Sequence, residues 1–150
     1  MRVSSAIEQI EELLRGTPNL EGVLEVLMED VFAERGCLWR EDQEVVYCGN
    51  DELRTKFPFS RTAVDSVLTH GRGFVAFTPD GNHDVCRSKS VENFHVRSVL
   101  CAPVVDGNGK PVAIFYFDNR TSAGSFTEDD LDYLREVVAQ VPAGALRNCA

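Results

Sequence analysis

Histidine and cysteine side chains give this sequence its most evident chemical potential. His83, Asp84 and Cys86 lie close together, and His95 follows a little further on. Imidazole, carboxylate and thiolate groups are ligands for zinc and other transition metals. A single His-x-x-Cys spacing is a weak motif, however, and residues 79–89 are rich in Pro, Gly, Asn and Asp, which indicates a polar loop. We therefore predict no metal site.

Two of the cysteines could instead support redox chemistry. Cys86 has Arg87 and Lys89 nearby, and cationic neighbours lower the pKa of a thiol and favour the reactive thiolate. Cys101 lies in an apolar run, where a buried thiol packs as a small hydrophobic group. The chain has five cysteines and no C-x-x-C pair, which suits a reducing cytoplasm better than a disulfide framework. Inert thiols are the preferred interpretation, and a cysteine-based redox enzyme remains an alternative.

No other catalytic arrangement can be read from the sequence. The acidic run Glu128-Asp129-Asp130 has the position of a helix cap rather than of a catalytic pair. Gly71 and Gly73 lack the remaining residues of a phosphate-binding loop. No Ser/His/Asp or Cys/His arrangement stands at an informative spacing. We therefore predict that the chain is not an enzyme and has no catalytic residues.

Composition narrows the possible partners and the location. The net charge of −9 disfavours a surface that binds nucleic-acid phosphates. No apolar run approaches the roughly 20 residues of a membrane span, and the acidic, helical pattern at the N-terminus is not that of a signal peptide. A length of 150 residues is enough for one domain with its own core. We expect a single cytoplasmic domain over residues 1–150 that binds neither nucleic acid nor membrane.

The elements that must position any site are organised around one hairpin. Two apolar runs, Ser98–Val105 and Pro111–Phe117, flank the turn sequence Asp106-Gly107-Asn108-Gly109, which is typical of a tight hairpin. Both runs are apolar at successive positions, so we expect central strands covered on both faces. Thr127, with Asp130 three residues later, predicts the start of a final helix.

The rest of the chain predicts an α+β sandwich. Helices from the two termini should gather on one face of a mainly antiparallel sheet, and a middle helix should cover the other face. Leu68 is expected on the buried side of that middle helix. Further elements are expected at Ser4–Arg15 (helix), Leu20–Glu34 (helix), Cys37–Arg40 (strand), Val45–Cys48 (strand), Arg61–His70 (helix), Gly73–Thr78 (strand) and Ser90–Phe94 (helical turn), with the final helix ending or bending near Pro142.

Several strings in this order resemble the GAF domain, over nearly the whole chain. They are AERGCLW at Ala33–Trp39, the helix Ser60–His70, RSVLCAPV at Arg97–Val104, VAIFYFDN at Val112–Asn119 and FTEDDLDYL at Phe126–Leu134. The resemblance is closest to GAF domains of bacterial signalling proteins, joined to sigma-factor-dependent activators, forkhead-associated modules, cyclases or histidine kinases. It implies about six antiparallel strands, a small-molecule pocket on one face, and terminal helices on the other that dimerise and pass a signal to an output domain.

Departures from the known ligand signatures leave the ligand and any cofactor unknown. The Asn-Lys…Phe…Asp-Glu motif of cyclic-nucleotide-binding members cannot be placed. Cys86 is followed by Arg87, whereas the bilin-attachment cysteine is usually followed by histidine. The cysteine set of methionine-sulfoxide-reducing members is not reproduced either.

We predict a pocket between the sheet and the segment Ser60–His95. The expected lining residues are Phe74, Phe77, Phe94, His95, Arg97, Cys101, Phe115 and Tyr116. Strand alternation decides which of Phe115 and Tyr116 faces this pocket, and the alternative is that these aromatic rings close an ordinary core.

The function that follows is a regulatory, non-catalytic sensor module that controls an output domain. Its dimer and signal-transmission helices would be residues 1–16 and 127–146. The alternatives are a structural dimerisation module with an empty pocket and, behind it, the redox enzyme.

Overall fold

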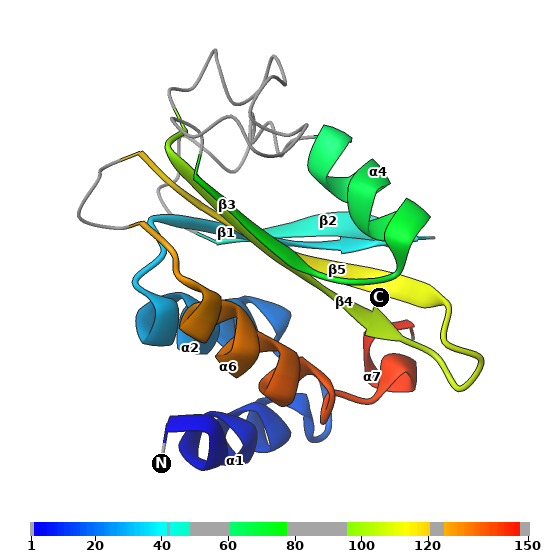
Figure 1. The fold of residues 1–150 in the computed structure, drawn as a ribbon. Coiled ribbons are helices and arrows are strands. Elements are labelled where there is room, and N and C mark those ends of the chain that lie inside the picture. The colour runs from blue at the N-terminus through cyan, green and yellow to red at the C-terminus, as the bar shows by residue number, and fades with distance from the viewer. Residues whose placement is uncertain (1, 42, 49–60, 78–95, 121–124, 148–150) are drawn as a thin grey trace.

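A five-stranded antiparallel sheet separates two layers of helices (Figure 1). The computed structural model describes residues 2–41, 43–48, 61–77, 96–120 and 125–147. The strand order is β2-β1-β5-β4-β3, with every neighbouring pair antiparallel. The strands are β1 (Arg35–Arg40), β2 (Gln43–Cys48), β3 (Phe74–Phe77), β4 (Ser98–Val105) and β5 (Pro111–Asn119). The helices are α1 (Arg2–Leu14), α2 (Leu20–Val31), α4 (Arg61–His70), α6 (Glu128–Val138) and α7 (Ala143–Arg147).

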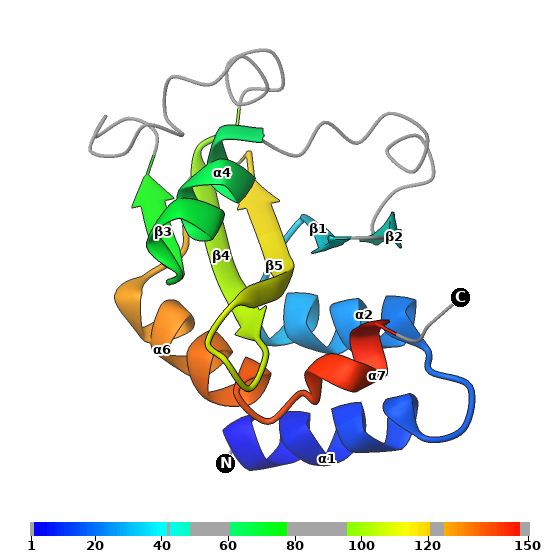
Figure 2. The same cartoon turned by 90° about the vertical axis from the view of Figure 1, so that its right-hand side faces the viewer.

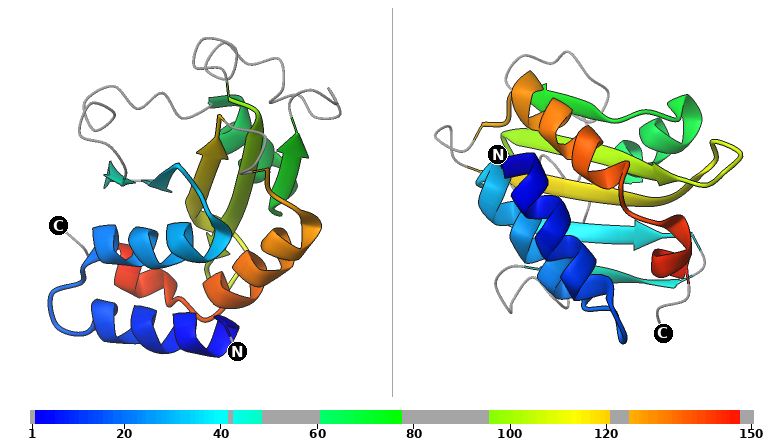
Figure 3. Two further views of the ribbon diagram at one scale, coloured as in Figure 1. Left: turned by 90° about the vertical axis from the view of Figure 1, so that its left-hand side faces the viewer. Right: turned by 90° about the horizontal axis from the view of Figure 1, so that it is seen from below.

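The two faces of the sheet carry different helices, which confirms the predicted α+β arrangement. Seen from below, α1, α2, α6 and α7 lie across one face (Figure 3, right). On the opposite face, α4 lies over β4 and β5 (Figure 2). The described residues supply five strands, and the sixth strand implied by the family resemblance is not seen among them.

The β4–β5 hairpin forms where the turn sequence predicts it. The Asp106 carboxylate accepts hydrogen bonds from the backbone N–H groups of Asn108 (2.9 Å) and Lys110 (3.0 Å), so the aspartate side chain closes the turn from inside. Gly109 has φ +79°, a conformation that glycine adopts without steric cost. The hairpin places β5 in the centre of the sheet, between β1 and β4.

The larger core lies between the sheet and the terminal helices. Phe115 and Phe117 of β5 are fully buried there, and their parallel rings stand 6.5 Å apart. Ala6 and Ile10 of α1 are also buried, so the first helix is part of this core rather than a loose extension. Other buried members are Val23, Leu24, Leu27, Val31, Leu38, Leu100, Leu131, Leu134, Val137 and Val138.

Helix α2 ends three residues earlier than its apolar pattern predicts. The apolar pattern predicts a helix to Glu34, but the helix stops at Val31 because Phe32 adopts the left-handed conformation, with φ 57°, and donates its N–H to the Met28 carbonyl. A left-handed residue is a common helix end, although glycine usually occupies it. The early stop lets β1 begin at Arg35 instead of Cys37.

Two other expectations about helices can be compared with the structure, and the first of them is wrong. Leu68 is 37% exposed, so among the described side chains of α4 the buried ones are Ala63, Val64 and Val67. The segment 127–146 is divided into α6 and α7, which confirms the break expected near Pro142. Tight i→i+3 hydrogen bonds from Gln140 to Val137 and from Val141 to Val138 end α6 before Pro142, which has no N–H to continue the helix.

Removing the α6 cap should lower stability by about 1 kcal/mol. The Thr127 side chain accepts a hydrogen bond from the Asp130 N–H (3.3 Å), and the Asp130 carboxylate accepts one from the Thr127 N–H (2.9 Å). Thr127→Ala leaves the Asp130 N–H without this partner, so urea denaturation should show a lower free energy of unfolding. Thr69→Ala, at an exposed position in the last turn of α4, is the matched control and should stay within about 0.5 kcal/mol of the parent. Equal losses in the two variants would contradict the role of the cap.

Candidate functional site

The second, smaller core lies between α4 and the sheet, and we call it the α4-side cluster. Ala63, Val64 and Val67 form its helical side. Its buried residues on the strands and on the segment entering β4 are Cys37, Ala76, Val96, Val99, Cys101, Ile114 and Tyr116, with Trp39 and Phe74 packed against them. The cluster is where a pocket on this face of the sheet would have its floor.

Three of the predicted lining residues do lie together on this face. Tyr116 of β5 is the register partner of both Cys37 on β1 and Cys101 on β4, and Cys101 is the partner of Phe74 on β3. Because directly paired residues project from the same face of a sheet, these four side chains form one row across it. Cys37 was not predicted as a lining residue, and its place in this row is settled by strand pairing.

The remaining predicted residues do not join this row. Phe115 is next to Tyr116 in an extended strand and therefore points to the opposite face, into the terminal-helix core. Phe77 is half-buried at the end of β3, and the guanidinium of the exposed Arg97 lies 5.8 Å from its ring centroid. Phe94 and His95 are outside the described residues.

A buried ion pair borders the α4-side cluster. Arg35 Nε and Nη2 donate to the two carboxylate oxygens of Asp118 at 2.6 and 2.5 Å, and the two residues are 3% and 0% exposed. Tyr116 Oη donates to Asp118 at 2.7 Å. Such a bidentate arrangement compensates two charges that would otherwise be costly to remove from water. We call these three residues the Arg35–Asp118–Tyr116 network.

The sequence contained a signal for this network that pattern reasoning missed. Asp118 is the one acid in the apolar run VAIFYFD, and Arg35 lies in AERGCLW; both strings carry the family resemblance. A carboxylate in a strand that is apolar on both sides needs a buried partner, and arginine is the usual one. What could not be read locally is the pairing, because the two residues are 83 positions apart.

Burial favours the protonated forms of the Cys37 and Cys101 thiols and of the Tyr116 phenol. Burial raises the pKa of Cys37, Cys101 and Tyr116 well above their ordinary values, and the negative charge of Asp118 raises each further. A thiol whose pKa is raised is a poor nucleophile at neutral pH. Cys101 therefore fits the interpretation of a small buried hydrophobic group, while Cys86 lies outside the described residues.

Raising the pH should destabilise the domain through these groups. Their pKa values are higher in the folded protein than in the unfolded chain, so the stability they contribute is complete below the unfolded values, 9.0 for cysteine and 10.0 for tyrosine, and is lost as the pH rises beyond them. Each group should then cost about 1.4 kcal/mol per pH unit. Urea denaturation between about pH 7 and pH 10.5 measures this. Tyr116→Phe should flatten the decline above pH 10, and a curve that this substitution leaves unchanged would contradict the assignment.

The end of β5 connects this network to helix α2. Asn119 follows Asp118 and is fully buried. Its side chain donates to the Phe32 carbonyl at 3.0 Å and accepts a hydrogen bond from the Glu34 N–H. The left-handed Phe32 and the nearby Glu34 are therefore tied to the strand that carries Asp118 and Tyr116.

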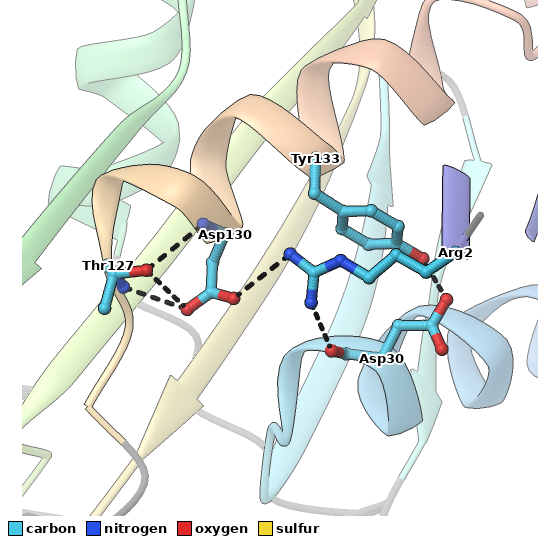
Figure 4. Close-up of polar contacts among 5 residues, drawn as sticks. All are labelled: Arg2, Asp30, Thr127, Asp130 and Tyr133. Carbon is cyan, nitrogen blue, oxygen red and sulfur yellow. Dashed lines mark hydrogen bonds and ion pairs between the residues drawn. The ribbon is translucent and has the colours of Figure 1, made fainter.

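A second set of polar contacts ties α1, α2 and α6 together just beyond this junction (Figure 4). The Arg2 guanidinium lies 4.3 Å from the centroid of the Tyr133 ring, donates to the Asp30 carbonyl at 3.1 Å and approaches Asp130 at 3.7 Å. Tyr133 Oη donates to the Asp30 carboxylate. Burial and this hydrogen bond raise the pKa of Tyr133. The three helices thus meet at one point, two residues before Phe32.

The described part of the chain contains neither a metal-binding group nor a membrane-spanning helix. No three His, Cys, Asp or Glu side chains gather there in a way that could hold a metal ion. His83, Asp84, Cys86 and His95 are all outside that part. None of the described helices combines the length and the apolar character that crossing a bilayer requires.

Comparison with known proteins identifies the family. The GAF domain family matches residues 19–144. A search of curated proteins finds no match. The chain is similar in structure to the nlh2 GAF domain of A. aeolicus in an inactive state, with a TM-score of 0.68 and 14% identity over 98% of both chains.

Two further solved structures agree with this result. The phycoerythrobilin-bound GAF domain of a cyanobacterial phytochrome has a TM-score of 0.69 and 13% identity over 96% of this chain and 94% of that one. The GAF domain of a phosphoenolpyruvate-protein phosphotransferase from Coxiella burnetii has a TM-score of 0.62 and 16% identity, over 98% and 94%. At these identities the likeness shows the fold alone. Since the family match spans most of the sequence, this chain belongs to the GAF domain family.

Proposed function

We propose that this domain is a non-catalytic sensory or regulatory module that controls an output domain of a bacterial signalling protein in the cytoplasm. A small molecule would bind on the α4 side of the sheet, beside Phe74, Cys101 and Tyr116. The observation that carries the proposal is the Arg35–Asp118–Tyr116 network, because it places polar groups at the border of an otherwise apolar cluster. Apolar walls with a few placed polar groups are the usual make-up of ligand sites.

The contacts beyond the network offer a route by which a bound ligand would change the positions of the terminal helices. From Asp118, the neighbouring Asn119 reaches the end of α2 at Phe32, and Asp30 on that helix holds Arg2 and Tyr133. A ligand that binds one arrangement of this junction more tightly than another shifts the population toward it, by no more than the difference in affinity. The output domain would read the changed position of α1 and α6.

Native mass spectrometry of protein exposed to cell extract tests ligand binding. We expect an added small-molecule mass that disappears on denaturation. Phe74→Ala should reduce its occupancy, since Phe74 packs against the α4-side cluster, whereas Val75→Ala, one residue away and packed against the terminal-helix core, should not. Protein that stays free of added mass after exposure, or equal loss in both variants, would overturn the proposal.

The alternative, a structural dimerisation module with an empty pocket, has one observation in its favour. A small apolar groove between α1 and the end of α6 is lined by Ile7, Leu14, Val137 and Val141, among others. Ile7 and Leu14 are only half-buried within one chain. Apolar side chains left partly exposed along a helix pair fit a surface that a second copy covers.

Substitutions on α1 should therefore separate a dimer into monomers. Ile7→Glu with Leu14→Glu places two charges in the groove while leaving the fully packed Ala6 and Ile10 in place. Light scattering should report a halved mass. Glu8→Lys, at an exposed position of the same helix, is the control and should leave the mass unchanged. A dimer that survives the double substitution would exclude this surface. Dimerisation without any retained ligand would favour the structural module.

A further inference from the structure

A groove on the terminal-helix side of the sheet lies apart from the α4-side cluster. It runs between the start of β3, the end of β4 and the last turn of α6, and its volume is about 300 Å³. The apolar lining includes Ala102 and Pro103 from β4, and Val138 and Val141 from α6 and the segment after it. Small-molecule sites have volumes of about 300–1,000 Å³ and mostly apolar walls. The groove is therefore large enough for a compact apolar group.

Two arginines from different elements also line this groove. Arg72 immediately precedes Gly73 at the start of β3, and Arg135 on α6 donates from Nη2 to the Gly73 carbonyl at 3.5 Å, which brings both side chains to the same end. Within the described ranges, these two arginines form one ion pair, between Arg135 and Asp132 at 4.0 Å. An ion pair at that distance between exposed side chains is weak. Both guanidinium groups can accept an anion.

The sheet edge beside the groove is unsuited to a peptide strand. β4 continues from Ala102 to Val105 past Cys101, the last residue that pairs with β3. The Cys101 carbonyl oxygen lies close to Gly73 and so points toward the β3 side, and by alternation the backbone of Pro103 points there too. Proline has no N–H to donate at that edge. A strand that approached would lose a ladder hydrogen bond, which favours a small molecule as the occupant.

We propose that this groove binds a small carboxylate with a compact apolar body. Arg72 and Arg135 hold the carboxylate, because guanidinium groups match its geometry with paired hydrogen bonds. The apolar body lies against Ala102, Pro103 and Val138. In a chain with a net charge of −9, these two cations make the groove selective for an anion. The site is independent of any ligand on the α4 side of the sheet.

The test uses 4-fluorobenzoate as the probe, with ¹⁹F NMR titration and ¹H–¹⁵N spectra of the whole chain. Saturable binding should shift the amide signals of Arg72, Gly73 and Val105. The neutral isostere 4-fluorobenzamide should bind about tenfold more weakly, because it lacks the charge that the arginines recognise. Shifts confined to Phe74, Cys101 and Tyr116, or no saturation, would overturn the proposal while leaving the proposed sensory function in place.

Variants distinguish binding in the groove from a general attraction of the anion to positive charge. The double variant Arg72→Gln with Arg135→Gln should abolish the preference for the anion. The double variant Arg15→Gln with Lys110→Gln changes the net charge by the same amount at exposed sites elsewhere, and it should keep that preference. Val105→Glu provides a second variant that keeps both arginines. Val105 is 44% exposed and lines the groove, so the new carboxylate should weaken 4-fluorobenzoate binding about tenfold with little effect on folding. Unchanged binding in Val105→Glu and in the double arginine variant would reject the site.

Discussion

Replacing Asp118 with asparagine should lower the free energy of unfolding by about 3–5 kcal/mol. The substitution keeps the size of the side chain but removes its charge, so the Arg35 guanidinium is left uncompensated at 3% exposure. Burial by itself lowers the pKa of Arg35, and the hydrogen bond and negative charge of Asp118 outweigh that effect and raise it. Tyr116 also loses its charged acceptor. Urea denaturation at pH 7 gives the measurement, and a loss of this size is a large part of the stability of a domain.

Two further variants show whether the loss comes from the unpaired charge. Arg35→Met with Asp118→Leu removes both ions and should be more stable than Asp118→Asn alone, since no charge then remains buried. Asp132→Asn removes a carboxylate that is 69% exposed and 4.0 Å from Arg135, and it should change stability by no more than about 0.5 kcal/mol. If the double variant lost as much stability as the single substitutions Arg35→Met and Asp118→Leu together, the network would have to be explained by packing instead.

Replacing Gly73 with alanine should lower the free energy of unfolding by about 2–3 kcal/mol. A Cβ atom at this position would lie 2.4 Å from the Cys101 carbonyl oxygen and 3.1 Å from the Ala102 Cα. These are backbone atoms of β4, so the strain can be relieved only by moving β3 away from its partner. Urea denaturation measures the loss, and amide chemical shifts of Phe74 and Cys101 should move with it.

Gly144→Ala is the matched control for this substitution. Nothing lies within 4 Å of the Cβ that alanine would add there, and the residue is in helix α7. Alanine is the better helix former by about 1 kcal/mol, so this variant should be as stable as the parent or more so. An alanine at position 73 that was tolerated equally well would contradict a close approach of the chain at Gly73 to β4.

Features of the fold that depend on nearby residues could be predicted from the sequence. The Asp106–Gly109 turn and the Thr127–Asp130 cap are each formed within a few positions, and both are confirmed. The end of α2 was missed although it is local, because Phe32 takes a conformation in which glycine would be expected. Its left-handed conformation is accompanied by contacts from Asn119, 87 positions away.

The candidate site was predictable only in part, because it depends on strand pairing. Local alternation shows that Phe115 and Tyr116 face opposite sides, but only the pairing of β5 with β1 and β4 shows that Tyr116 joins Cys37 and Cys101. For the same reason the partner of Asp118 could not be read from its own strand. The apolar character of Phe74 and Cys101 was sufficient to place them in a core. It was not sufficient to separate the two cores, since Phe115 was expected on the same side of the sheet as Phe74 and Cys101 but lies in the terminal-helix core.

The order of the strands has a consequence for how the domain is made. The N-terminal hairpin of β1 and β2 joins the C-terminal hairpin of β4 and β5 through the β1–β5 pairing alone, and that pairing joins residues such as Arg35 and Asp118. Contacts between residues so far apart along the chain form late in folding, because a long loop must first be ordered. During synthesis, β1 has no partner on one edge until residues 111–119 have been added. The complete sheet should therefore form only once the last quarter of the chain has been added, and until then the helices α1 and α2 should have each other and the β1–β2 hairpin to pack against.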